Sequence, residues 1–138
     1  MIVKVEEVRD ILARIRKVKV AVYGDFCLDA YLKLDQRGSE VSVETGRKAG
    51  AVGNAVYSLG GAGNVAANIA ALEPESIAAI GVAGPDPFGR EIVRQLEALN
   101  VRTGGIVVQE DGFATMTYCK QVLDHEEIAR LDFGVFNR

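Results

Sequence analysis

The sequence predicts an α/β fold in which a parallel sheet carries helices on its faces, with a small β-sheet added to it. Three short apolar segments typical of buried strands, residues 19–24, 76–84 and 106–109, alternate with segments that have the periodicity or composition of helices. Such alternation favours a parallel sheet, because neighbouring parallel strands need a crossover connection that is usually a helix. Residues 31–59 and 113–132 have the composition of strands and turns instead, and are expected to form the addition.

The first helix is expected over residues 5–17. Val5, Val8, Leu12 and Ile15 recur there at three- and four-residue spacing, with charged residues between them. This spacing gives a helix one apolar stripe and one charged face.

Two more helices are expected between the strands. The alanine-rich run 65–72 has small side chains, which allow a helix to approach a sheet closely. Asp86 can cap a further helix that has Pro87 at its first position. Asn100 can end that helix in the left-handed conformation.

The β-rich segments are expected to hold short antiparallel strands. Within residues 31–59, short apolar stretches are separated by Gly38, Gly46, Gly50 and Gly53. Asp111-Gly112 is a hairpin signal, which predicts that residues 114–123 return beside residues 106–109.

Composition limits the classes of function. The 138 residues are 49% hydrophobic and 25% charged, with a formal net charge of −3, which is typical of one globular domain. The basic residues are scattered, which disfavours nucleic acid and a membrane surface as partners. No apolar run is long enough to span a bilayer, and the first residues turn polar too soon for a signal peptide. A cytoplasmic protein is therefore expected.

The cysteines and the histidine predict little special chemistry. Cys27 and Cys119 are far apart in the sequence and are expected to be free thiols. His125 is the single histidine, which excludes a zinc site of histidines and cysteines.

A glycine-rich stretch, Gly60-Gly61-Ala62-Gly63-Asn64, precedes the alanine-rich helix. Glycines at a strand-to-helix junction let the backbone approach a ligand, and free amides at the helix start attract polar oxygens. The side chain of Asn64 can both donate and accept, which suits sugar hydroxyls. The same glycines could merely form a tight turn. They also fit the dinucleotide fingerprint as Gly61-x-Gly63-x-x-Ala66, with Asp86 as the ribose-binding acid, although that fingerprint normally follows the first strand directly.

Two carboxylates, Asp25 and Asp29, follow the first expected strand. Ligands of open α/β sheets bind at the carboxyl ends of the strands. Carboxylates accept charge-assisted hydrogen bonds from hydroxyl groups, so both residues are candidates for sugar binding, with turn capping as the alternative.

These motifs, in this order, resemble the ribokinase-like (phosphofructokinase B) carbohydrate kinase family. The similar segments are Gly24-Asp25-x-x-Leu28-Asp29, the run from Gly60 to Asn68, the run from Gly81 to Gly89, and Arg130-Leu131-Asp132-Phe133. Within the family, the likeness is greatest to the kinase domain of the bifunctional heptose 7-phosphate kinase/adenylyltransferases. Two departures leave the sugar open: Ser42-Val43-Glu44-Thr45-Gly46 replaces a proline-rich segment of those kinases, and Tyr118 stands where they tend to carry lysine.

The resemblance implies the roles of particular residues. Asp29 and Asn64 would bind substrate hydroxyls, and Gly60 and Gly61 would present backbone to the sugar. Residues 31–59 and 113–132 would form a β lid, which in this family often also joins two subunits into a homodimer. Further contacts to the substrate are expected from the lid residues Glu44, Lys120 and Arg130.

The resemblance also implies that sugar binding and catalysis lie in different parts of the full-length kinase. Residues 1–30 and 60–112 would be the sugar-binding part of a kinase core that transfers the γ-phosphate of Mg-ATP to a hydroxyl of a sugar or sugar phosphate. The family's second half carries a Gly-Ala-Gly-Asp motif with the general base and the anion hole, and it holds the nucleotide. That motif does not occur in this sequence, so this C-terminal catalytic and ATP-binding half is expected to be absent and the chain alone to be inactive. A non-catalytic module that keeps only the subunit contact remains the alternative.

Overall fold

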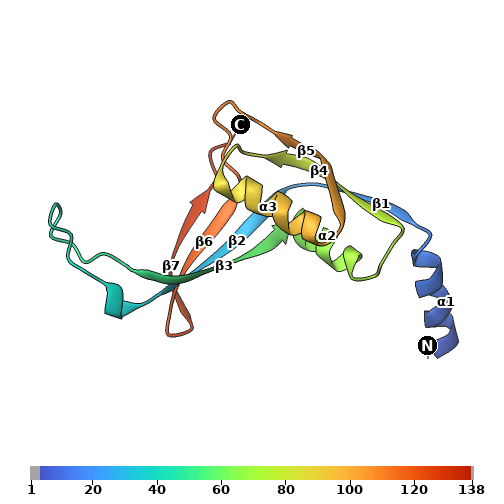
Figure 1. Ribbon diagram of the computed structural model, residues 1–138, viewed down its shortest axis with the longest axis horizontal. Coiled ribbons are helices and arrows are strands. Elements are labelled where there is room, and N and C mark those ends of the chain that lie inside the picture. Colours follow the sequence, from blue (N-terminus) through green and yellow to red (C-terminus); the bar gives the residue numbers. More distant parts are fainter. Residues whose placement is uncertain (1–3, 138) are drawn as a thin grey trace.

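The computed structural model describes residues 4–137, which form two sheets and three α-helices (Figure 1). In chain order the elements are α1 (Val5–Ile15), β1 (Lys19–Tyr23), β2 (Phe26–Leu34), the short 3-10 helix η1 (Gln36–Gly38), β3 (Val52–Gly61), α2 (Ala62–Ala70), β4 (Ser76–Ala83), α3 (Pro87–Ala98), β5 (Val101–Val108), β6 (Thr117–Leu123) and β7 (Glu126–Phe133).

The first sheet has three strands in the order β1-β4-β5, all parallel, as the alternation of elements predicts. Its third strand begins at Val101, earlier than the expected residue 106. Asn100 has a φ of 58° and turns the chain from α3 directly into the strand. Gly104 and Gly105 lie inside β5.

Helices α2 and α3 cover one face of this three-stranded sheet. Its buried residues Val22, Ile77 and Ala79 join Ile92 and Leu96 of α3 in a single core. The stretch of small residues in α2 brings Ala66 to full burial in the same core. Phe26 and Leu28 of β2 belong to this core as well, so the two helices also hold the second sheet in place.

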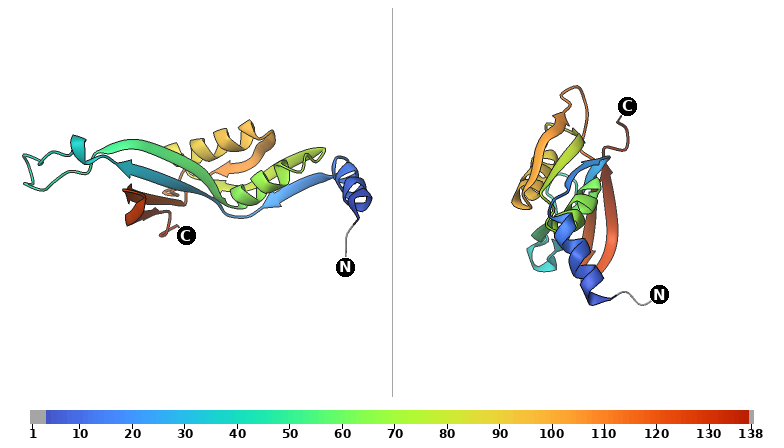
Figure 2. Two further views of the ribbon diagram at one scale, coloured as in Figure 1. Left: turned by 90° about the horizontal axis from the view of Figure 1, so that it is seen from below. Right: turned by 90° about the vertical axis from the view of Figure 1, so that its right-hand side faces the viewer.

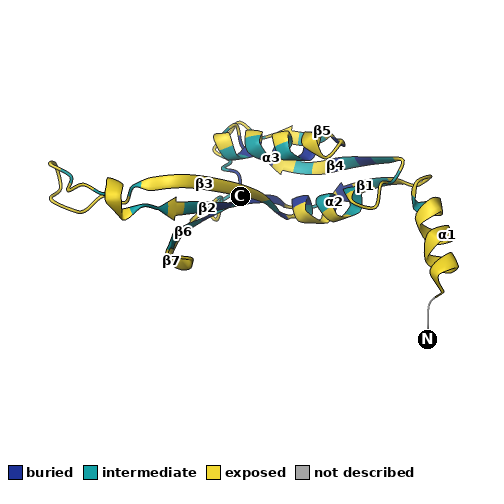
Figure 3. Ribbon diagram, turned by 60° about the horizontal axis from the view of Figure 1, so that its bottom comes forward, coloured by how far each residue is buried: buried dark blue, intermediate teal, exposed yellow. Residues whose placement is uncertain are grey.

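The opposite face of the three-stranded sheet is open among the described residues. Large apolar side chains are exposed there: Tyr23, Ile80, Val82 and Val107. Helix α1 stands at one end of the molecule with no buried residue, and its apolar stripe is exposed (Figure 3).

The second sheet has four strands in the order β3-β2-β6-β7. Strand β2 pairs antiparallel with β3 and parallel with β6, and β6 pairs antiparallel with β7. The hairpin expected at Asp111-Gly112 is wrong, because β5 and β6 lie in different sheets and the residues between them cross from one to the other. The hairpin lies at Asp124-His125 instead, where both residues have positive φ, 48° and 73°.

The segment 31–59 contains long strands rather than the several short ones expected. β2 begins only two residues after β1, and together with β3 it forms a long ribbon of two strands. The connection between them carries η1 and an isolated bridge between Val41 and Lys48. This loop forms the end of the elongated molecule that lies opposite α1 (Figure 2).

The predicted ends of α3 are confirmed. The Asp86 carboxylate accepts hydrogen bonds from the amides of Phe88 and Gly89, at 3.0 and 2.9 Å, and Pro87 is the first helical residue. The glycine-rich stretch spans the junction of β3 and α2, as expected for a strand-to-helix turn. Cys27 and Cys119 are both free and buried.

Candidate functional site

A polar patch lies on one face of the four-stranded sheet. Because alternate residues of a strand point to the same side and paired residues share a side, three neighbouring strands each contribute two side chains to it. We define the polar patch as Asp29 and Tyr31 of β2, Tyr118 and Lys120 of β6, and Arg130 and Asp132 of β7. The sheet therefore gathers three of the residues that the sequence singles out, Asp29, Lys120 and Arg130.

An ion pair joins Asp29 to Lys120 at the centre of the polar patch. Lys120 Nζ donates to Asp29 Oδ1 at 2.7 Å and to the hydroxyl oxygen of Tyr31 at 3.3 Å. The ammonium also lies 4.7 Å from the centroid of the Tyr31 ring. The two side chains are only 19% and 24% exposed, so water screens this pair less than an ion pair at the surface. The hydrogen bond to Asp29 raises the pKa of Lys120, which keeps it charged.

A second ion pair lies on β7. Arg130 bonds to Asp132 at 2.8 and 2.9 Å, and its guanidinium lies 5.3 Å from the centroid of the Tyr118 ring. The hydrogen bond to Asp132 raises the pKa of Arg130 further. Both cations of the polar patch are thus paired with a carboxylate and lie over a tyrosine ring.

Gly60 and Gly61 close the site where β3 ends. A Cβ on Gly60 would lie 2.7 Å from Cys27 Sγ and 3.1 Å from Asp29 Oδ2. Gly61 has a φ of 52°, and a Cβ there would lie 2.5 Å from the Asp25 carbonyl oxygen. The absence of side chains therefore leaves room for Oδ2 of Asp29 beside Gly60 and lets the chain turn tightly into α2.

Asp25 lines a cavity of 360 Å³ at the carboxyl ends of β1 and β4. The other lining residues include Tyr23, Gly24, Gly81 and Met116. Ligands of open α/β sheets bind at this edge. The carbonyl oxygen of Asp25 accepts the amide of Ala62 at 2.9 Å, which ties the cavity to the start of α2.

The remaining predicted residues lie apart from the polar patch. Asn64 is exposed in the first turn of α2, just beyond the glycines. Glu44 is exposed on the loop between η1 and β3, at the far end of the molecule. A contact of Glu44 with the same ligand stays a prediction.

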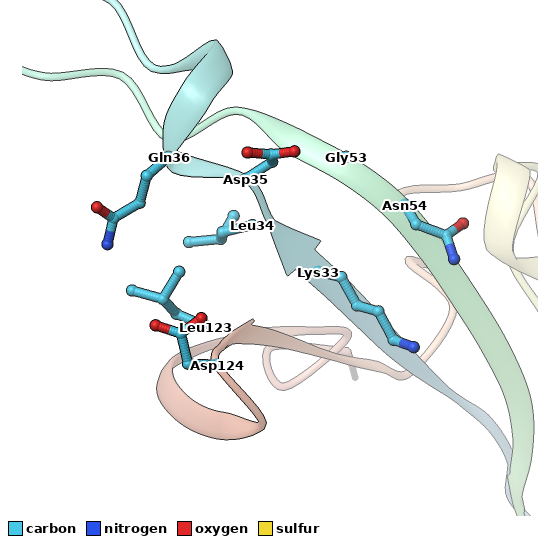
Figure 4. Close-up of a pocket in the computed structure, with 8 residues that line it drawn as sticks. All are labelled: Lys33, Leu34, Asp35, Gln36, Gly53, Asn54, Leu123 and Asp124. Carbon is cyan, nitrogen blue, oxygen red and sulfur yellow. The ribbon is translucent and has the colours of Figure 1, made fainter.

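A larger hollow, of 580 Å³, lies at the end of the four-stranded sheet near this loop (Figure 4). It is lined by Lys33, Asn54, Leu123 and Asp124 among others, and contains none of the predicted site residues. Asp35 also lines this hollow, and the hydrogen bond from the side chain of Arg37 lowers the pKa of Asp35 to about 2. We favour the smaller cavity at Asp25, because it lies at the strand ends and beside the glycines.

Within residues 4–137, no group of three or more histidine, cysteine, aspartate or glutamate side chains could hold a metal ion. Burial raises the pKa of the Cys27 thiol, and the carboxylates of Asp29 and Asp25 raise it further, so this thiol stays protonated and inert at neutral pH.

The sequence did not single out Tyr31, Tyr118 and Asp132 as site residues. Each of them lies two residues from Asp29, Lys120 or Arg130 on the same strand, and this spacing, which puts both side chains on one face, could have indicated them. The register between strands, which brings β7 beside β6 and β6 beside β2, has no local signal in the sequence.

Solved structures of known proteins share this fold. The chain superposes on a carbohydrate kinase from Agrobacterium tumefaciens with a TM-score of 0.63 at 18% identity, covering 83% of this chain and 34% of that one. For ribokinase from Cryptococcus neoformans, solved with ADP, the TM-score is 0.59 at 20% identity, with coverage of 83% and 33%. The predicted class, a ribokinase-like α/β fold with a small additional β-sheet, is confirmed.

The particular family follows from the sequence comparison. The profile of the pfkB family carbohydrate kinases matches residues 17–129, and the chain belongs to this family. It is 34% identical over 122 residues to D-beta-D-heptose 7-phosphate kinase of Bordetella bronchiseptica, covering 87% of this chain and 37% of that protein. It is 31% identical over 119 residues to the bifunctional protein HldE of Campylobacter concisus, covering 85% of this chain and 24% of that protein. The likeness to heptose kinases inferred from the motifs is confirmed.

The chain spans about a quarter to about a third of the length of these relatives. No helix among residues 4–137 combines the length and the apolar character needed to cross a membrane.

Proposed function

We propose that this chain is the sugar-binding N-terminal portion of an ATP-dependent carbohydrate kinase. The parent enzyme would transfer the γ-phosphate of Mg-ATP to a hydroxyl of a sugar or sugar phosphate in the cytoplasm. The observation that carries the proposal is the half-buried ion pair of Asp29 and Lys120, with Gly60 leaving Oδ2 of Asp29 open. A carboxylate that has a free acceptor and lies beside a cation is suited to bind hydroxyl groups.

The residues divide the work of binding. Asp29 would accept hydrogen bonds from hydroxyls, and Asn64, which is exposed just beyond the glycines, would contact another part of the sugar. Gly60 and Gly61 would let the sugar approach the backbone. Asp25 would line the adjoining cavity at the carboxyl ends of β1 and β4. The four-stranded sheet would cover the sugar as a lid and exclude water from it, with Lys120 and Arg130 on its inner side.

The chain alone is proposed to bind and orient the sugar without transferring phosphate. Phosphoryl transfer depends on positioning and on electrostatic stabilisation of the group in transit, with metal ions that neutralise its charge. A ribokinase solved with ADP and a sugar kinase solved with ATP are among the structures of similar fold, which supports nucleotide use by the parent.

Binding is tested by calorimetric titration of the chain with D-ribose, D-fructose and D-heptose 7-phosphate, the sugars that the names of its relatives and structural neighbours suggest. At least one sugar should bind, and Asp29→Ala should weaken that binding by tenfold or more, since a hydrogen bond to a charged group contributes about 1.5–3 kcal/mol. The exposed residue Asp111 provides the control, because Asp111→Asn should leave the affinity unchanged. Wild-type affinity in Asp29→Ala would remove Asp29 from the site.

The dinucleotide alternative finds less support in the geometry. The glycines follow β3, which pairs antiparallel with β2 rather than opening a βαβ unit. The carboxylate of Asp86 is engaged by the amides of Phe88, Gly89 and Thr115, so it is not free for a ribose. Titration with NAD⁺ should show no saturable binding.

A homodimer through the four-stranded sheet is proposed as a second property. Apolar side chains are exposed along its two edge strands: Val52, Val56, Ile128, Leu131 and Phe133. Exposed apolar side chains on the edge strands of a sheet are candidates for protein contacts. Light scattering should report a dimer that Ile128→Lys dissociates.

A further inference from the structure

The ion pair between Asp29 and Lys120 leaves one acceptor and one donor free, side by side. A lysine ammonium has three N–H donors, of which Asp29 Oδ1 and the Tyr31 hydroxyl engage two. The carboxylate of Asp29 keeps Oδ2, which faces the position of the missing Gly60 side chain. The ion pair, in which Nζ lies 2.7 Å from Oδ1, holds the ammonium and the carboxylate next to each other.

Two neighbouring groups of this kind, one with a free donor and one with a free acceptor, suit a vicinal diol. Neighbouring hydroxyl oxygens on a sugar ring are about as far apart as two hydrogen-bonded heavy atoms, so one hydroxyl can donate to Asp29 while its neighbour accepts from Lys120. The Tyr31 hydroxyl and ring hold the ammonium in place, which lowers the entropy lost when a ligand binds.

The polar patch has no cation in excess. Its two carboxylates and two cations form two pairs, Asp29 with Lys120 and Asp132 with Arg130. Binding a phosphate there would require one of these cations to leave its carboxylate, which would remain unpaired in a half-buried position. Hydroxyl groups need no such exchange.

Resting on the proposed function, we infer that Lys120 is a specificity-determining residue that, together with Asp29, recognises a vicinal diol of the sugar and does not recognise a phosphate. Tyr31 is the positioning residue that aims the ammonium. A phosphate carried by the substrate would then lie away from the polar patch.

The inference is tested on the sugar that the chain binds best. Lys120→Met should weaken its binding by about tenfold or more, because a charged hydrogen-bond donor is lost. Lys33 provides the matched control, since it lies on the same face of β2, is exposed and forms no ion pair with a described residue. Lys33→Met should bind the sugar within about twofold of the wild type.

Deoxy analogues of that sugar separate recognition from a merely structural role. Removing the hydroxyl that Lys120 contacts should weaken binding to the wild-type chain by about tenfold, and should cause no further loss in Lys120→Met. A structural role would instead give the same loss in both proteins. Inorganic phosphate should not compete with the sugar.

Lysine-detected NMR gives a readout that needs no variant. Adding the sugar to the wild-type chain should shift the Nζ resonance of Lys120 and leave that of Lys33 in place. If no sugar binds at all, the proposed function is overturned. If a sugar binds but Lys120 neither shifts nor affects affinity, or if phosphate competes, the inference fails while the proposed function stands.

Discussion

Gly61 has a backbone conformation that the turn from β3 into α2 beside the candidate site requires. Its φ of 52° is unfavourable for residues with a side chain, and a Cβ would meet the rigid carbonyl of Asp25 at 2.5 Å. We predict that Gly61→Ala lowers the free energy of unfolding by about 2 kcal/mol or more, because backbone strain and a clash add up.

Chemical denaturation measures this loss. Gly104 provides the control, since a Cβ there meets nothing within 4 Å and β5 is extended. Gly104→Ala should be neutral or slightly stabilising. Equal stability of Gly61→Ala and wild type would show that the turn into α2 tolerates a side chain.

At the scale of single residues, local patterns in the sequence single out candidate residues but do not determine where in the fold they lie. Asp29 was expected to follow the first strand, and it lies within the second strand, β2. The side chain reaches its partner Lys120, 91 residues further along the chain, through strand pairing. Local patterns show which residues can bind hydroxyls, whereas the choice of partner depends on register.

At the scale of elements, helix α3 stabilises the segment 109–116, which connects the three-stranded sheet to the four-stranded sheet. Asp86 Oδ1 caps the helix, while Oδ2 accepts the amide of Thr115 at 2.7 Å. The Thr115 hydroxyl, which is buried, accepts the amide of Gly84 at 2.8 Å. One carboxylate therefore fixes both the start of α3 and the segment that leads into β6.

The contribution of the Asp86 hydrogen bonds to the free energy of unfolding should depend on pH. Burial of Asp86 would raise its pKa, but the hydrogen bonds from Thr115, Gly89 and Phe88 together outweigh burial and lower the pKa below the ordinary 3.8. A carboxyl with a lowered pKa in the folded state contributes stability above its unfolded pKa and loses it as the pH falls through the folded one. The contribution of Asp86 should thus be complete at neutral pH and fade below about pH 4.

Asp86→Asn tests this. The asparagine side chain has one acceptor oxygen and one NH₂ donor, so it can accept from the cap amides or from the Thr115 amide but not from both. The NH₂ group then faces the other N–H donor, and we predict that the free energy of unfolding falls by about 2 kcal/mol at pH 7. The difference in unfolding free energy between the variant and the wild type should shrink below about pH 4. Asp111→Asn, on the same crossing segment and exposed, should leave stability at pH 7 unchanged. A difference in unfolding free energy that stays constant with pH would contradict this role of the Asp86 carboxylate.

The elements show which signals were local. The cap at Asp86 and the left-handed Asn100 were predicted from single residues and are present, because capping is decided by neighbours in sequence. The hairpin at Asp124-His125 was missed, since neither residue is a glycine although both have positive φ. The hairpin signal at Asp111-Gly112 was overridden by tertiary structure, since the adjoining strands entered different sheets.

For the whole molecule, the three-stranded sheet is covered on only one face by the described residues. Parallel sheets in stable α/β proteins are covered on both faces. Here the open face presents Tyr23, which is 83% exposed, and Val107, which is 62% exposed. The edges of β1 and β5 are also without a neighbouring strand in this sheet. Alternation of elements in the sequence predicted the sheet, but it carries no information on which face would be left open.

This open face should make the isolated chain prone to associate. Burying Ile80 and Val107 between copies would remove apolar surface from water at about 25 cal/mol per Å². We predict that the double variant Ile80→Lys and Val107→Lys lowers the fraction of assemblies larger than a dimer in light scattering at a given concentration, because two charges oppose burial. Val43→Lys is the matched control, since that side chain is fully exposed on the distant loop and away from both sheets. A monomeric wild-type chain that melts cooperatively at high temperature would show that the open face causes no association.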